Sequence, residues 1–115
     1  MSNIHIDHEV LSSLQEVMED DYLTLLDTFL KDSDIRISQL HKATSPQALG
    51  YAAHSFKGSS SNMGAKALAD LCRQLEERVK QPPLNDIENL INQIDREYEA
   101  VRQLYAAERQ RVLIG

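Results

Sequence analysis

Cysteine, proline, glycine and aromatic residues are scarce in this chain of 115 residues, and these shortages narrow the possible structures. The single cysteine, Cys72, cannot form an intramolecular disulfide, and a cysteine-based zinc site is not expected. Tryptophan is absent and aromatic residues make up only 5%, which favours a helical core packed from Leu, Ile and Ala. No apolar run approaches the roughly 18–20 residues that span a bilayer, and residues 1–9 lack the features of a secretory signal. We therefore expect a cytoplasmic protein that does not contact a membrane.

Basic residues are in the minority, with 12 Lys and Arg against 18 Asp and Glu, which gives a formal charge of −6. Nucleic acid is therefore not an expected partner, because phosphate backbones are bound by cationic surfaces. The glycine-rich phosphate loops of nucleotide-binding proteins are missing as well, so we expect neither an ATP site nor autokinase activity. The length predicts one domain over residues 1–115, since single domains usually have about 100–150 residues.

Apolar residues recur at helical spacing between the few Gly and Pro residues, without the alternation typical of strands. We expect a short helix over about 8–18, capped by Asp7, and longer helices over about 20–44, 45–64, 65–80 and 85–105. Asn85 with Glu88 resembles a capping box, and the tail from residue 106 either extends the last helix or frays. The second helix is expected to bury a stripe formed by Leu23, Leu26, Leu30 and Ile37, widened by Tyr22, Leu25 and Phe29.

Four long amphipathic helices with short connections predict an all-α fold, an antiparallel four-helix bundle with a short additional N-terminal helix. The bundle core is expected over about 20–108. Such helices can bury one another's apolar stripes, so we expect a monomer.

The third of these helices presents a histidine to solvent. At 100° per residue, its apolar and small residues fall within about 60° of one direction, and His54 lies about 140° from the centre of that face. The predicted core face consists of Leu49, Ala52, Ala53, Phe56, Ser60 and Met63.

Four neighbours share the outer face with His54: Gly50, Lys57, Gly58 and Ser61. Each glycine inside a helix costs roughly 1 kcal/mol against alanine, so two of them here favour clearance for a partner surface. Lys57 supplies a cation close to the ring, which suits an anion on the imidazole. A neutral histidine at cytoplasmic pH is a nucleophile, and phosphoryl transfer needs mainly alignment and charge neutralisation.

These residues carry a family resemblance over about a quarter of the chain. Residues 51–79, with His54, Lys57-Gly58, Met63-Gly64 and the stripe that follows, resemble the histidine-containing phosphotransfer (HPt) domain of the stand-alone bacterial type. The resemblance implies a phosphorelay intermediate, with His54 as phosphoacceptor, Lys57 as phosphoryl stabiliser and Gly58 as room for docking. It also implies receiver domains of hybrid histidine kinases and of response regulators as partners. No cofactor of its own is expected, and Mg²⁺ would come with the receiver domain.

Glu76 departs from the pattern that this resemblance implies. Well-known members of the family place a glutamine 22 residues after the histidine, hydrogen-bonded to the imidazole. Here that position is Glu76, at the edge of the predicted buried stripe and within reach of His54. A carboxylate there would fix the imidazole tautomer but would sit unfavourably near a phosphoryl group. The residue would then be either an imidazole partner or the partner of a nearby cation.

Other interpretations remain open at this stage. His54 could be an ordinary surface histidine in a non-phosphorylated helical adaptor, or a general base, although no motif supplies the rest of a nucleophilic site. His5 and His8 flank Asp7, but an ordered helix start is favoured there and no metal site is expected. Cys72 is interpreted as a core residue, and Arg73 as an outer residue that could help to dock a partner.

Overall fold

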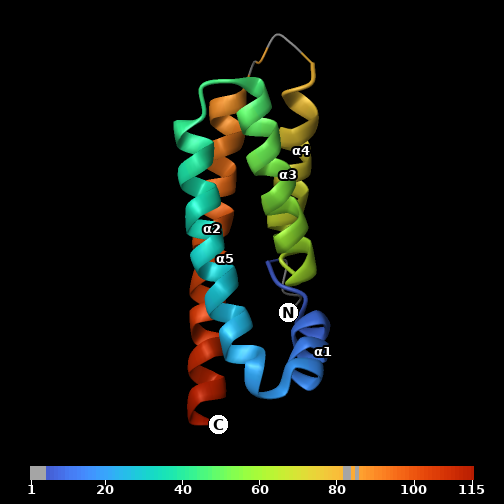
Figure 1. Cartoon of the computed structure of the whole chain (residues 1–115), viewed down its shortest axis with the longest axis vertical. Coiled ribbons are helices and arrows are strands. Elements are labelled where there is room, and N and C mark those ends of the chain that lie inside the picture. Colours follow the sequence, from blue (N-terminus) through green and yellow to red (C-terminus); the bar gives the residue numbers. More distant parts are fainter. Residues whose placement is uncertain (1–4, 82–83, 85) are drawn as a thin grey trace.

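The computed structural model describes residues 5–81, 84 and 86–115, and this part of the chain is helical without strands. A short helix α1 (His8–Met18) is followed by a 3₁₀ turn, η1 (Glu19–Asp21). The four longer helices are α2 (Tyr22–Lys42), α3 (Pro46–Asn62), α4 (Lys66–Arg78) and α5 (Ile87–Ile114). They run side by side as an antiparallel bundle, with α3 against α4, while α1 lies beyond the turn that joins α3 and α4 (Figure 1). The all-α prediction and the short lead helix are confirmed.

The helix that carries His54 begins and ends where its sequence predicts. Ser45 caps α3, because its side chain accepts a hydrogen bond of 3.1 Å from the backbone N–H of Ala48, and Pro46 follows in the first turn. At the other end Gly64 adopts a φ of +82°, which only glycine adopts without strain. These two signals fix the length of α3 and therefore the height of His54 along the bundle.

The other helix ends agree with expectation in part. Asp7 caps α1 through the N–H of Glu9 and also pairs with Lys66 at 2.7 Å. Asn85 of the predicted capping box lies outside the described residues; α5 begins at Ile87 after Asp86, whose side chain makes no capping bond. The tail extends α5 to Ile114, which is one of the two predicted alternatives. None of the described helices is long and apolar enough to cross a membrane.

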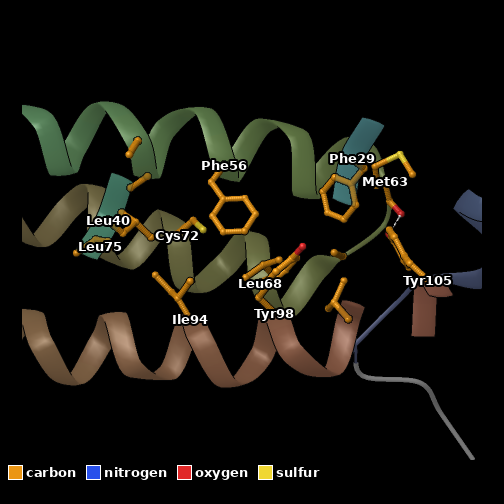
Figure 2. Packing of buried hydrophobic residues seen from close by; sticks show 14 of the residues in the cluster. Phe29, Leu40, Phe56, Met63, Leu68, Cys72, Leu75, Ile94, Tyr98 and Tyr105 are labelled. Carbon is orange, nitrogen blue, oxygen red and sulfur yellow. Dashed lines mark hydrogen bonds between the residues drawn. The ribbon is translucent and has the colours of Figure 1, made fainter. Parts of the chain in front are cut away.

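All six residues of the predicted α3 core face are buried. Phe56 points from α3 into the bundle, where its ring meets that of Tyr98 edge to face at 5.9 Å (Figure 2). Cys72 is also buried, as predicted, and burial raises the pKa of its thiol to about 12. Because the inner face of α3 is held by close packing, its outer face is a stable platform.

The predicted stripe of α2 is confirmed for most of its residues and differs from the structure at Leu23. The buried residues are Tyr22, Leu26, Phe29, Ser33 and Leu40, whereas Leu23 is half-buried and outside the core. Tyr22, which was expected to widen the stripe, is fully buried, and its hydroxyl donates a hydrogen bond of 2.6 Å to Glu108 of α5. This bond gives the polar hydroxyl of Tyr22 a partner on another helix, which allows the whole side chain to be buried.

Candidate functional site

His54 lies on the outer face of α3, and 65% of its side chain is exposed to solvent. The residues on the opposite side of the same turns, Ala53 and Phe56, are fully buried. The prediction of a solvent-facing histidine is therefore confirmed. An exposed imidazole in the middle of a rigid helix is accessible to a partner without any rearrangement of the bundle.

Glu76 of α4 holds both polar neighbours on α3. Its Oε2 lies 2.7 Å from Nδ1 of His54, and its Oε1 accepts a hydrogen bond of 2.7 Å from Nζ of Lys57. The side chain is only 15% exposed, yet the hydrogen bond from Lys57, helped by that from His54, lowers the pKa of its carboxyl. Glu76 is therefore ionised at neutral pH. The two sequence alternatives for Glu76, an imidazole partner and a cation partner, occur together.

The ionised carboxylate determines the state of the imidazole. A carboxylate can only accept hydrogen bonds, so Nδ1 of His54 must carry the proton in the bond to Glu76. In the neutral ring, Nε2 then has the free lone pair. Within the described residues Nε2 has no hydrogen-bond partner, so the nucleophilic nitrogen is the one that is left available.

Gly58 and Ser61 continue the open surface beside the ring. A Cβ built on Gly58 would meet nothing within 4 Å, which agrees with the predicted clearance. Ser61 is exposed and lines a groove of about 490 Å³ between α3 and α4. The other residues along this groove are Lys57, Gly58, Asn62, Lys66, Ala69, Asp70 and Arg73.

The space beside Gly50, unlike that beside Gly58, is filled. A Cβ at Gly50 would lie 3.2 Å from Cγ2 of Val79, so the space beside this glycine is taken by the residue that follows α4. The helical wheel gave the direction of Gly50 but not the position of the neighbouring helix. Gly50 permits the close approach of α3 and α4, and the clearance predicted there is found at Gly58.

Tyr51 was missed by the sequence analysis. It lies one turn before His54 and is 70% exposed, and Ile35 of α2, 48% exposed, lines the same groove of about 480 Å³. The remaining lining residues are Ser38, Gln39, Lys42, Ala43 and Ala48. A large aromatic residue off the buried stripe of a helix was the available signal, since exposed apolar residues beside a polar site are typical of contact surfaces.

The other residues singled out from the sequence lie away from His54 or are bonded to other side chains. Arg73 faces outward on α4, with its guanidinium bonded to Asp70 and Glu77. Nδ1 of His5 lies 2.7 Å from Glu97 of α5. Among the described residues, no group of three or more His, Cys, Asp or Glu side chains is gathered that could hold a metal ion. The chemistry of this surface therefore centres on His54.

Comparisons with known proteins agree with this arrangement. The Hpt domain family matches residues 24–104 of the chain, a range that contains His54, Lys57 and Glu76. Among solved structures, the chain is similar to histidine-containing phosphotransfer protein B (HptB) from Pseudomonas aeruginosa PAO1, with 52% identity and a TM-score of 0.91. That alignment covers 96% of this chain and 98% of the HptB chain. The search of curated proteins finds no match. The chain therefore belongs to the Hpt domain family, and it is a phosphoryl carrier of phosphorelays rather than a kinase.

Proposed function

We propose that His54 accepts a phosphoryl group on Nε2 from the aspartate of a hybrid sensor kinase's receiver domain and passes it to the aspartate of a response regulator. The observation that carries this proposal is the state of the imidazole. Nδ1 is bound to Glu76 at 2.7 Å, while the ring stays largely exposed and Nε2 has no partner in the part of the chain that the structure describes. An exposed nucleophilic nitrogen in a fixed orientation is what the attack on an acyl phosphate needs.

The proposed reaction is a simple displacement at phosphorus. The lone pair of Nε2 attacks the phosphorus of the phosphoaspartate, the bond between phosphorus and the aspartate oxygen breaks, and that oxygen leaves as a carboxylate. The product ring carries phosphorus on Nε2 and keeps its proton on Nδ1. Lys57 lies on the same face and offsets part of the added negative charge.

A receiver domain that reaches Nε2 must also cover the surroundings of His54. A standard interface buries about 800 Å² per partner, which corresponds to a disc of roughly 16 Å radius. Such a disc centred on His54 includes Gly58 and Ser61 on one side and Tyr51 on the other, since they lie within two helical turns. We infer that the open backbone at Gly58 admits the partner and that Tyr51, with Ile35, supplies apolar contact.

We further propose that the protein acts as a cytoplasmic monomer and that Mg²⁺ enters the reaction with the receiver domain. The monomer is supported by the packing of the four long helices, which bury the central apolar residues between them. The acidic residues needed to hold Mg²⁺ are then a property of the partner, which also carries the aspartate that reacts.

The proposal is tested by phosphoryl transfer. Wild-type protein is incubated with a panel of phosphorylated receiver domains from the same genome, and its labelling is followed over seconds to minutes with an acid-quench control. We expect rapid, acid-labile labelling of the wild type and none of His54→Gln, a loss of at least about 10³-fold. His41→Gln is the matched control, because His41 is also exposed and also bonds a carboxylate, Asp95. Absence of labelling from every receiver would favour the non-phosphorylated adaptor instead.

A further inference from the structure

Glu76 places a full negative charge where a neutral glutamine would make the same hydrogen bond to His54. The carboxylate lies 2.7 Å from Nδ1 and its pKa is held low, chiefly by Lys57. A glutamine could accept from a protonated Nδ1 or donate to an unprotonated one, whereas a carboxylate can only accept. The carboxylate is therefore selective for one protonation state of the ring, in both the free and the phosphorylated protein.

That selectivity matters most when the phosphoryl group leaves. With phosphorus on Nε2 and a proton on Nδ1 the ring is a cation, and a receiver carboxylate attacking phosphorus displaces neutral imidazole. In this step the bond between phosphorus and Nε2 breaks, its electron pair returns to Nε2, and the proton stays on Nδ1. Without the Nδ1 proton the leaving group would be an imidazolate anion, which departs far more slowly.

Resting on the proposed function, we propose that Glu76 is a positioning residue that keeps the Nδ1 proton on phosphorylated His54 up to a higher pH, so that the ring leaves phosphorus as neutral imidazole. The 2.7 Å bond to Nδ1 places the carboxylate against the positive charge that phosphorylation creates on the ring. A structural role in joining α3 to α4 would require the bond but not its charge.

The other charges around His54 do not cancel this effect. Lys57 of α3 is bonded to the second oxygen of Glu76. Its positive charge weakens the electrostatic attraction between the carboxylate and the Nδ1 proton, but the carboxylate stays bonded to His54. On α4 the next charged residues, Arg73 and Glu77, are bonded to each other at 3.0 Å. On the α2 side, Lys42 lines the far groove beyond Tyr51. The charges in direct contact with the site are thus Glu76 and Lys57, and they act on the Nδ1 proton in opposite directions.

The test measures the proton directly. His54 is phosphorylated with phosphoramidate, and the pH midpoint at which the phosphorylated ring loses its Nδ1 proton is measured by ¹⁵N NMR. We expect the midpoint of Glu76→Gln to lie at least about one pH unit below that of the wild type, and that of Lys57→Gln to lie above it. Glu77→Gln is the matched control, because this acid on the same helix bonds Arg73 rather than His54, and its midpoint should equal that of the wild type.

The same variants are then followed in transfer to a receiver domain. Above both midpoints, Glu76→Gln should transfer about tenfold more slowly than the wild type, and at acid pH the two should agree. Equal midpoints for wild type and Glu76→Gln would overturn the inference, as would a downward shift in both Glu76→Gln and Lys57→Gln, which indicates a disturbed structure. Failure of every receiver to label His54 would overturn the proposed function instead, while the titration would still decide where the proton resides.

Discussion

His54 and His41 form a natural pair for comparison, because each is an exposed histidine bonded to a carboxylate of a neighbouring helix. His54 bonds Glu76 at 2.7 Å through Nδ1, which leaves the distal nitrogen Nε2 available. His41 bonds Asp95 at 2.7 Å through Nε2, so its distal nitrogen is the one engaged. The carboxylate of Glu76 is also less exposed than that of Asp95, 15% against 34%.

With His54 as the proposed phosphoacceptor, the difference implies that a histidine–carboxylate pair is not sufficient to make such a site. Its function depends on which ring nitrogen is bonded and on what surrounds the other one. Around His54 the chain places an open glycine, a cation and an exposed aromatic ring; His41 occupies the last turn of α2, where a basic side chain suits the helix dipole. The former arrangement fits the partner docking that we propose, and the latter fits a helix C-terminus.

The largest loss of phosphoryl transfer at His54 is expected when the open surface beside it is blocked by a bulky side chain. Gly58→Glu should keep the fold, since a Cβ there meets nothing within 4 Å, but it places a bulky negative charge where we propose that the receiver docks. We expect kcat/KM for transfer to fall about 100-fold, measured in the receiver assay, with an unchanged thermal midpoint.

Gly50→Ala is the matched control for that experiment. Its Cβ would lie 3.2 Å from Val79, so the substitution acts on the packing of α3 against α4 rather than on docking. We expect transfer within about twofold of the wild type. Unchanged transfer in Gly58→Glu, or a comparable loss in Gly50→Ala, would contradict the assignment of Gly58 as the docking surface.

A smaller effect is expected at Tyr51. Tyr51→Ala removes the exposed aromatic ring one turn from His54 and should raise KM for the receiver about 5- to 30-fold, as for a typical aromatic interface residue. Reactivity of His54 towards phosphoramidate should not change, because the bond that orients the imidazole comes from Glu76 and not from Tyr51. Val17→Ala, at an equally exposed apolar residue of α1, is the control. Equal effects of the two substitutions on KM would remove Tyr51 from the docking surface.

Much of the site was predictable because it depends on directions along single helices. The exposure of His54 follows from its angle to a strongly apolar face, and the reach of Glu76 follows from its place at the edge of the α4 stripe. Both inferences need only the helical repeat and the certainty that the apolar face turns inward.

The parts that were not predictable depend on contacts between helices. The helical wheel cannot show that Val79 fills the space beside Gly50, nor that the hydroxyl of Tyr22 bonds Glu108 of α5. A nearby cation is one of the two alternative partners predicted for Glu76, but spacing along α3 alone could not identify that cation as Lys57, whose ammonium lies 2.7 Å from Oε1 of Glu76. The helices themselves could be predicted from the sequence, whereas the contacts between side chains of different helices could not.

The smallest expected effect concerns stability at Glu76. Because Lys57 and His54 hold its pKa below the ordinary value of 4.5, ionised Glu76 stabilises the folded chain above that value, and this contribution is lost as pH falls through the lowered folded-state pKa. The unfolding free energy of the wild type should therefore exceed that of Glu76→Gln more at pH 7 than at pH 3, by less than about 1 kcal/mol.

Urea unfolding at the two pH values measures this difference, and Lys57→Gln should remove most of it, because the bond from Lys57 is the main cause of the shift. A difference that stays constant between pH 7 and pH 3 would mean that Glu76 stabilises the bundle through shape or packing. Its negative charge would then add little to folding, and any effect of that charge would have to appear in the protonation of phosphorylated His54 alone.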